Sequence, residues 1–243
     1  MPSYTAALPS VDLLAQQARW LAPARAFLLR RAGIAHHHAV LDLGAGRGMV
    51  TAELLRRSSG TVYALDLSFD ALHEINPATT LIRIVGNAHH LPLASARLDL
   101  VFSQFTLLWS GNLARCVSEI GRVLRPGGHF CAIEPDYHAL IEHPSATAVA
   151  PIWLAALNRA GAIADVGRQL PGLLQGQGLD VKVRLLDELQ PPSPLRFAML
   201  RELPLRPEES GRVRAAETAA AALPGWQQLS HLPLFLIHAI RGQ

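Results

Sequence analysis

The strongest constraint on this chain is the stretch of residues 40–51, which reads VLDLGAGRGMVT: a short apolar run, then three glycines at alternate positions. An apolar run just before glycines predicts a buried strand that turns sharply into a helix, and glycine lets backbone approach a ligand closely. A dinucleotide-binding GxGxxG pattern would place its third glycine where this chain has Met49. The stretch therefore predicts a small-molecule cradle that fits a dinucleotide poorly.

Strands and helices are expected to alternate along the first half of the chain. The expected strands are residues 40–43, 61–67, 81–85, 98–103 and 129–134, and the helices between them are 49–57, 68–75 and 113–124. Such alternation specifies a parallel sheet with helices on both faces. We therefore expect a doubly wound, Rossmann-like α/β fold.

The second half supplies two more strands, which makes a mostly parallel sheet of seven. Residues 179–186 alternate apolar and charged side chains, as in an edge strand with one wet face, while residues 232–240 are nearly all apolar, as in a strand inside the sheet. Residues 191–225, between these strands, are too long for a hairpin loop and are expected to form a helical cap over the ligand edge. Further helices are expected at 10–21, 23–33, 146–164 and 168–175.

Length and apolar content set the domain organisation. With 243 residues, half of them apolar, the chain can bury one good core. We expect a single domain over residues 1–243, made of N-terminal helices (1–34), a Rossmann-like core (35–190), the cap insertion (191–225) and the last strand (226–243). Cys116 and Cys131 have no paired spacing and are expected to be reduced core thiols.

Charge and hydropathy restrict the partners. The formal net charge is +3 and the arginines are interspersed with acidic residues, so nucleic acid is not indicated. No apolar run is long enough for a bilayer, and the start MPSY, with Asp12 ahead of any long apolar stretch, lacks the pattern of a signal peptide. We therefore expect a cytoplasmic protein without membrane contact, as a monomer or a homodimer.

Three acceptor-rich positions follow three successive expected strands: the glycine turn, Asp66 and Asn87. In open α/β sheets the ligand crevice lies outside the carboxyl ends of the strands, so the three can meet on one ligand. A carboxylate accepts from ribose hydroxyls, and an amide oxygen accepts from an exocyclic amine. The ligand indicated has a ribose, an amine-bearing base and a small zwitterionic tail.

Five stretches, in order and spacing, resemble the class I S-adenosylmethionine-dependent methyltransferases, in the style of the small-molecule enzymes of the ubiquinone/menaquinone-biosynthesis type. They are VLDLGAGRG (40–48), VYALDLS (62–68), GNAHHLPL (86–93), LDLVFSQF (98–105) and RVLRPGGHF (122–130), and together they cover roughly residues 35–135. The resemblance implies methyl transfer from S-adenosylmethionine to a small organic acceptor at O, N or C by in-line displacement. It also implies an antiparallel last strand inside the sheet.

The resemblance assigns cofactor-binding roles at the first strand and turn. Gly44, Gly46 and Gly48 would shape the pocket for the methionine moiety, and Asp42 would support that turn.

It assigns further cofactor-binding roles at the next strands. Asp66 would hold the ribose, with Leu67 against the adenine; Asn87 and Ala88 would recognise the adenine edge, and Gln104 would sit under the sulfonium. The family usually has Asp where this chain has Asn87, so the amide must offer its oxygen to the adenine amine.

A proton acceptor is needed only if the methyl acceptor must lose a proton. The candidates follow the fifth strand: His138 as a base, with Glu134, Asp136 and Tyr137 to orient an acceptor. The alternative is that Glu134 and Asp136 cap the next helix or bond loop backbone, and that the histidine is solvated. We expect no metal site, because the adjacent histidines 36–38 point in different directions.

Two other functions are open. One is an RNA or protein methyltransferase, although amino-methylating nucleic-acid enzymes of this fold tend to carry an Asn/Asp-Pro-Pro-aromatic tetrad where residues 103–106 read SQFT. The other is a non-catalytic protein that binds S-adenosylmethionine and regulates a partner. Methyl transfer in vitro discriminates between an enzyme and such a regulator.

Overall fold

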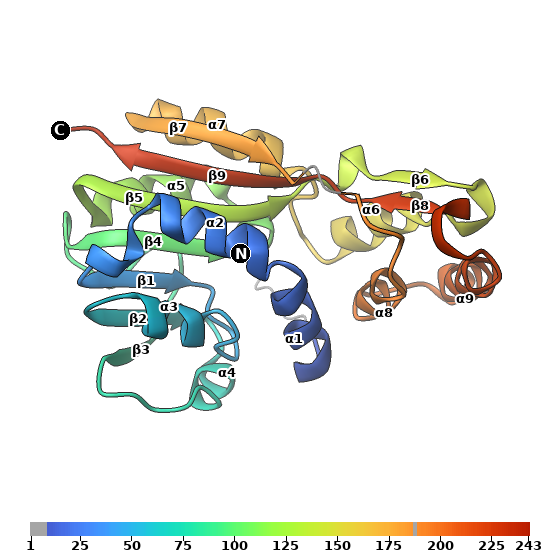
Figure 1. Cartoon of the computed structure of the whole chain (residues 1–243), viewed down its shortest axis with the longest axis horizontal. Coiled ribbons are helices and arrows are strands. Elements are labelled where there is room, and N and C mark those ends of the chain that lie inside the picture. Colours follow the sequence, from blue (N-terminus) through green and yellow to red (C-terminus); the bar gives the residue numbers. More distant parts are fainter. Residues whose placement is uncertain (1–8, 187–188) are drawn as a thin grey trace.

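In the computed structural model, which describes residues 9–186 and 189–243, seven strands form one sheet in the order β3-β2-β1-β4-β5-β9-β7 (Figure 1). The strands are β1 (Ala39–Leu43), β2 (Thr61–Asp66), β3 (Leu81–Val85), β4 (Leu98–Gln104), β5 (Leu124–Pro135), β7 (Leu179–Leu185) and β9 (Leu234–Arg241). All neighbouring pairs among β1 to β5 are parallel, and β9 runs antiparallel between β5 and β7. The predicted fold class is confirmed, including a last strand inside the sheet and β7 at its edge.

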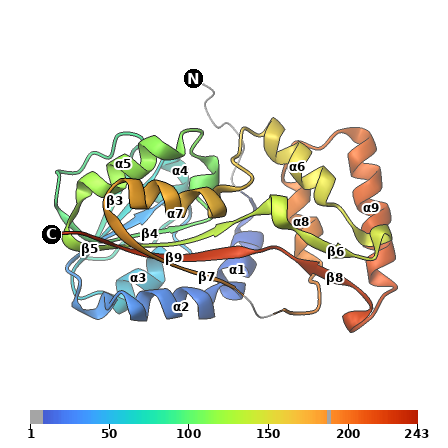
Figure 2. The ribbon, with the colours of Figure 1, turned by 90° about the horizontal axis from the view of Figure 1, so that it is seen from above.

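Helices cover both faces of the sheet, as Figure 2 shows, with α2 and α3 on one side and α5 and α7 on the other. The helices of this part are α1 (Val11–Trp20), α2 (Ala22–Arg31), α3 (Thr51–Arg57), α4 (Phe69–His73), α5 (Leu113–Val123) and α7 (Val166–Gly176). Successive strand residues alternate between the two layers: in β4, Leu100 and Phe102 pack in the α2–α3 layer, and Val101 packs in the α5–α7 layer. The central strands are therefore buried on both faces, which is why their sequences are mostly apolar.

A second group of elements lies beyond the carboxyl ends of β1, β4 and β5 (Figures 1 and 2). It contains α6 (Ala150–Arg159), α8 (Leu195–Arg201), α9 (Pro207–Ala221) and a two-stranded antiparallel sheet of β6 (Ile141–His143) and β8 (Leu229–His231). We call these five elements the cap. The cap takes in residues on both sides of the expected insertion 191–225, and the domain boundaries stay predictions.

Three local expectations differ from the structure. β5 begins at Leu124 rather than at residue 129, because the Pro-Gly-Gly at 126–128 is absorbed as an irregularity where the β4–β5 register shifts. The helix expected at 146–164 covers only Ala150–Arg159, and the left-handed Gly161 (φ +73°) follows its end. The short pair β6 and β8 was not predicted, since three residues carry too little periodicity.

Other expectations concern single residues and the membrane. Cys116 and Cys131 are buried free thiols, as predicted. Within residues 9–186 and 189–243, no helix has the length and apolar character needed to cross a membrane. The start MPSY, on which the expectation about a signal peptide depends, lies outside the described residues.

Candidate functional site at the carboxyl edge of the sheet

The glycine turn connects β1 to α3 and is held against β2. Gly44, Gly46 and Gly48 have φ values of +73°, +50° and +81°, the left-handed region that side chains other than glycine rarely adopt. The backbone N–H groups of Gly44 and Ala45 both donate to the carbonyl of Leu65, at 2.8 and 2.9 Å. The turn is therefore a fixed loop at the carboxyl edge of the sheet, as its sequence predicted.

Asp66 ends β2 and faces this turn. Its Oδ2 accepts from the N–H of Gly46 at 2.8 Å, and its Oδ1 accepts from the N–H of Ser68 at 2.9 Å. The N-cap of α4 is Ser68 itself, whose Oγ accepts from Ala71 N, so Asp66 does not serve as the cap. Each carboxylate oxygen keeps further lone pairs with which it can accept from ribose hydroxyls.

Asp42 lies on β1, two residues before Gly44. It is buried, and its Oδ2 accepts from Thr51 Oγ1 at 2.6 Å, which ties β1 to the first residue of α3. Burial raises the pKa of Asp42 to about 6, while the bond from Thr51 opposes that shift.

Apolar side chains are left exposed beside this edge. Leu67 is 59 % exposed, Phe69 58 % and Val85 54 %, and the β2–β3 register pairs Val85 with Asp66. An exposed apolar surface next to the carboxylate predicted to hold the ribose suits the flat face of an adenine. The placement of Leu67 thus fits the predicted contact.

Asn87 and Ala88 follow β3. Asn87 is exposed, and its Oδ1 accepts from the N–H of His89 at 2.8 Å in a local turn. The same oxygen is the atom that would have to accept from the adenine amine, and it has a second lone pair for that purpose. Asn87 Oδ1 therefore already forms a local turn and keeps one lone pair for a ligand.

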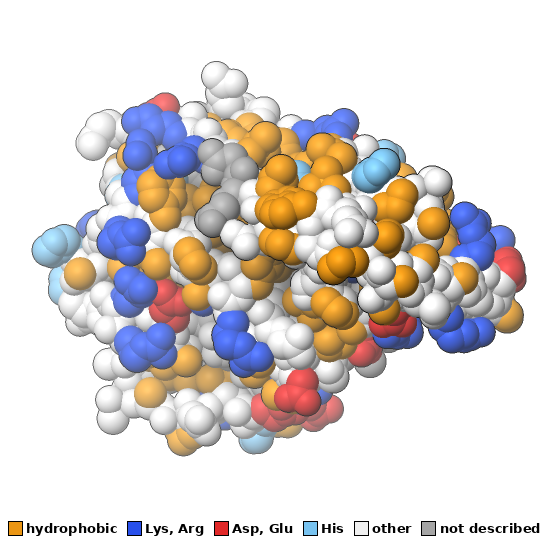
Figure 3. Space-filling model, turned by 45° about the vertical axis from the view of Figure 1, so that its right-hand side comes forward, with side chains coloured by type: hydrophobic (Ala, Val, Ile, Leu, Met, Phe, Trp, Pro, Cys, Tyr) orange, Lys and Arg blue, Asp and Glu red, His pale blue; other side chains and the backbone are white. Residues whose placement is uncertain are grey.

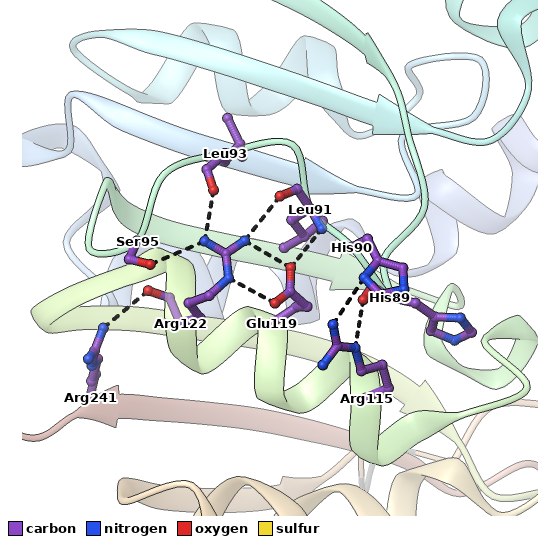
Figure 4. Close-up of polar contacts among 9 residues, drawn as sticks. All are labelled: His89, His90, Leu91, Leu93, Ser95, Arg115, Glu119, Arg122 and Arg241. Atoms are coloured by element: carbon purple, nitrogen blue, oxygen red, sulfur yellow. Dashed lines mark hydrogen bonds and ion pairs between the residues drawn. The ribbon is translucent and has the colours of Figure 1, made fainter.

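The loop that follows Asn87 is anchored to α5 by side chains that the sequence analysis did not identify (Figure 4). Glu119 accepts from Leu91 N at 2.8 Å, and Arg122 donates to the carbonyls of Leu91 and Leu93 at 3.0 and 2.9 Å. Arg122 also pairs with Glu119 at 2.8 Å, and its guanidinium lowers the pKa of that carboxyl. In the sequence, the only indication of this anchor is that Arg115, Glu119 and Arg122 recur at helical spacing. The same pattern is equally typical of a helix face in contact with solvent.

Gln104 ends β4 and is reached from α2. Its Oε1 accepts from Nη1 of Arg25 at 3.0 Å, and Arg25 Nε lies 2.6 Å from Glu53 of α3. Arg25 and Glu53 are both buried, and neither belongs to a sequence motif that indicates a site. The only indication in the sequence of this buried pair is the position of Arg25, a charged residue on the apolar face of the second helix.

The four residues proposed for acid–base or orienting roles separate in space. Glu134 is fully buried: Oε1 accepts from Ser103 Oγ at 2.9 Å, from Leu107 N at 3.1 Å and from Thr106 N at 3.2 Å. Burial raises its pKa to about 7, and Oε2 has no hydrogen-bond partner among the described residues. Asp136 is buried, accepts from His138 N at 3.1 Å and pairs with Arg168.

Tyr137 and His138 are adjacent in the sequence but differ in burial. Tyr137 is buried with its ring stacked on Trp153 at 4.9 Å between centroids, and burial raises the pKa of its hydroxyl. The His138 side chain is exposed.

A cavity of about 390 Å³ lies between the sheet edge and the cap. Its walls come from α1, the end of β4, the turn after β5, α6, α8 and β8, and the lining includes Trp20, Phe105, Tyr137, Trp153, Arg196 and His231. Glu134, Asp136 and His138 do not line it, so Tyr137 is the one among the four candidates that does. Figure 3 is turned so that the cap side of the molecule faces the reader. It shows hydrophobic side chains gathered on this face, with basic side chains to the left and right of them.

Phe105 lies between this cavity and the carboxyl edge of the sheet that carries the glycine turn and Asp66. It directly follows Gln104, lines the cavity and has φ +51°, a strained conformation for a bulky residue. Trp153 of α6 lines the cavity, whereas Trp226 is 63 % exposed and does not. In the described part of the chain, no group of three or more His, Cys, Asp or Glu side chains is placed to hold a metal ion.

Comparisons with known proteins agree with this geometry. Residues 41–132 match the family model described as "Methyltransferase domain". The chain is 41 % identical over 90 residues to malonyl-[acyl-carrier protein] O-methyltransferase of Dechloromonas aromatica (37 % of this chain, 33 % of that protein). It is 32 % identical over 91 residues to the mitochondrial arginine-hydroxylase NDUFAF5 of Rattus norvegicus (37 % and 26 %).

Among solved structures, the geranyl diphosphate C-methyltransferase of Streptomyces coelicolor A3(2) superposes with a TM-score of 0.65 at 18 % identity, over 94 % of this chain and 82 % of that one. At this identity the likeness concerns the fold. The matched segment is a third or less of each of the two sequence relatives named above. Residues 41–132 therefore match a methyltransferase domain, and the fold around them is that of solved methyltransferase structures.

Proposed function

We propose that this protein transfers a methyl group from S-adenosylmethionine to a small organic acceptor, at an O, N or C atom, held in the cavity under the cap. The observation that carries the proposal is the bond between Asp66 and the N–H of Gly46, which brings a ribose-binding carboxylate and the glycine turn to one edge. Phe105 then joins that edge to the cavity.

The residues present fit S-adenosylmethionine. The turn of Gly44 to Gly48 allows close backbone approach for the methionine moiety, Asp66 offers acceptors to the ribose, and Leu67 and Asn87 border the adenine position. When bound, the cofactor supplies a methyl group that its sulfonium already makes electrophilic.

The contribution of the chain is mainly placement. Holding an acceptor in line for displacement supplies a large part of the acceleration in such reactions. Glu134 orders residues 106 and 107 beside the glycine turn, so its proposed role is that of a positioning group. Tyr137 can orient an acceptor, because it faces the cavity. Asp136 would act by fixing the turn that carries Tyr137, through its bond from His138 N. We propose His138 as a base only for acceptors long enough to reach its exposed side chain.

The finer features of the proposal concern partners and place of action. We propose a cytoplasmic enzyme, a monomer or homodimer, that acts on a small molecule rather than on nucleic acid or a membrane.

The test is a coupled assay of S-adenosylhomocysteine formation with the purified protein and a panel of small acceptors. We expect at least one acceptor to give equimolar methylated product and S-adenosylhomocysteine. Binding of S-adenosylmethionine with no turnover on any acceptor would favour the regulatory alternative. Modification of an acceptor without S-adenosylhomocysteine would indicate a different chemistry, as the name of the hydroxylase relative illustrates.

A further inference from the structure

The cavity under the cap is lined by both apolar and polar side chains, and its Lys, Arg, Asp or Glu lining residues are all arginines. Aromatic and aliphatic side chains make most of it, including Trp20, Phe105, Tyr137 and Trp153. Two arginines, Arg19 and Arg196, also line it, and none of its described lining residues is an aspartate or a glutamate. Its volume of about 390 Å³ suits a small ligand.

The two arginines differ in burial. Arg19 lies on α1, and its side chain is exposed. The Arg196 side chain on α8 is only 12 % exposed, and its guanidinium lies 4.5 Å from the centroid of the Phe197 ring. Arg196 therefore presents a largely desolvated charge to the cavity, where an electrostatic contact is stronger than in water.

The hydrogen bonds of Arg196 are incompletely satisfied. Its Nη2 donates to Gln228 Oε1 at 3.2 Å. Its Nη1 is 3.7 Å from Glu142 Oε1, beyond hydrogen-bond distance, and neither atom has a hydrogen-bond partner among the described residues. The other Glu142 oxygen accepts from Val149 N and Ala150 N at 2.7 Å each. A buried N–H donor left without an acceptor costs free energy, which a ligand oxygen would recover.

We propose that the methyl acceptor is an apolar, aromatic-sized molecule that carries a carboxylate, and that Arg196 binds this carboxylate while the aromatic body packs against Trp153 and Tyr137. This inference rests on the proposed function, because it concerns the acceptor of that same reaction. A guanidinium matches a carboxylate through two parallel N–H donors, which an ammonium cannot do. The carboxylate is a handle, and the methyl-accepting atom lies elsewhere on the ligand.

Alternative roles of Arg196 are tested by the choice of variants. Arg196→Met alone would leave the buried Glu142 without its cation and destabilise the cap. The double variant Arg196→Met/Glu142→Gln removes both charges together and retains similar side-chain volumes. The matched control is Arg201→Gln in the same helix, where Arg201 forms an exposed pair with Glu217 at 2.7 Å.

The experiment measures binding of two isosteric probes, 2-naphthoate and 2-naphthamide, by calorimetry at neutral pH. We expect the full chain to bind the naphthoate at least about tenfold more tightly than the amide, a charge-assisted difference of about 1.4 kcal/mol. Arg196→Met/Glu142→Gln should lose this preference while its thermal unfolding stays cooperative, and Arg201→Gln should keep it. Equal affinities for the two probes, no binding of the naphthoate, or a preference that survives in the double variant would overturn the inference.

Failure of this inference is distinguishable from failure of the proposed function. Titration with S-adenosylmethionine reports on the Asp66 edge and does not involve the probes. A protein that binds S-adenosylmethionine and shows no preference for the naphthoate contradicts the acceptor class alone. A protein that prefers the naphthoate and binds no S-adenosylmethionine contradicts the methyltransferase proposal and retains the anion subsite.

Discussion

The Nε of Arg25 on α2 lies 2.6 Å from Oε2 of Glu53 on α3, and both side chains are buried at the edge where Gln104 ends β4. The pair connects a helix that precedes the sheet to the helix that the glycine turn opens. Glu53 has a second partner, Arg57, at 2.7 Å, but the Arg57 side chain is partly exposed. A buried ion pair therefore stabilises the carboxyl edge of the sheet where we propose that the cofactor binds. No local sequence motif indicates this pair.

Arg25→Met should destabilise the protein strongly, because it leaves Glu53 buried with one partly solvated cation. We expect a loss of about 3 kcal/mol in the free energy of unfolding, the usual size for breaking a buried pair from one side. Denaturant unfolding measures it. The double variant Arg25→Met/Glu53→Gln should lose less than Arg25→Met, since no uncompensated charge remains. A single variant as stable as the wild type would show that the pair contributes nothing.

Gly44→Ala and Gly33→Ala form a matched pair that separates backbone strain from steric overlap. Both glycines have φ near +70° (+73° and +69°). A Cβ at Gly44 would lie 2.2 Å from Thr106 Cγ2, whereas one at Gly33 would have no neighbour within 4 Å. We expect Gly33→Ala to cost about 1 kcal/mol and Gly44→Ala about 2 kcal/mol more, with cofactor affinity impaired only in the latter. Equal costs would refute the packing of Thr106 on the turn.

Arg122→Gln should weaken cofactor binding through the loop that follows Asn87. The substitution removes the donors to the carbonyls of Leu91 and Leu93 and the pair with Glu119. We expect a rise of about tenfold in the dissociation constant for S-adenosylmethionine, together with a loss of about 1–3 kcal/mol in stability. Arg125→Gln is the control, because Arg125 pairs with Asp99 at the start of β4, away from the cofactor edge. Identical affinities for the two variants would mean that this loop does not contact the cofactor.

The stability of the protein should fall in mild acid because of a histidine pair between β5 and β9. His129 Nδ1 lies 2.8 Å from His238 Nε2, and burial lowers the pKa of His238 to about 4 and that of His129 below its usual value. The positive charges of Arg31 and Lys182 lower the His238 pKa further, while Asp180 opposes them. The folded state thus favours the neutral form.

The sign of the pH dependence follows from that preference. The histidine contribution is complete above the ordinary pKa of 6.5 and is lost as the pH falls towards about 4. We expect His238→Gln to flatten the decline in stability over this window by an amount on the order of 3 kcal/mol, measured by denaturant unfolding from pH 7 to pH 4. His36→Gln, at an exposed position, should leave the decline unchanged. An identical decline in wild type and His238→Gln would contradict the assignment.

The sheet and the cofactor edge were predictable because their signals are local. A strand buried on both faces, such as β4, is mostly apolar. Gly44, which begins the glycine turn, Asp66 and Asn87 each lie at the carboxyl end of a strand or within two residues of it. The parallel topology then brings the ends of these strands to one edge without further information.

The buried ion pairs and the cavity could not be predicted, because the residues that form them are far apart in the sequence. Arg25 meets Gln104 across 79 residues, and Glu142 approaches Arg196 from a strand only three residues long. The cavity draws its lining from α1, the residue after β4, α6, α8 and β8, none of which shows an acceptor motif. Its existence depends on how the cap packs, which apolar periodicity does not specify. His138 directly follows the buried Tyr137 but is exposed, and adjacency in the sequence does not distinguish the two.

The most direct test of the account is calorimetric titration of S-adenosylmethionine into the wild-type chain, Asp66→Ala and Asp70→Ala. Asp66 bonds the glycine turn, whereas Asp70 is an exposed residue of the first turn of α4. We predict binding at one site per chain in the wild type and in Asp70→Ala, and a loss of at least about tenfold in affinity in Asp66→Ala with unfolding still cooperative. Absence of binding by the wild type, or unchanged affinity in Asp66→Ala, would contradict the assignment of this edge as the cofactor site.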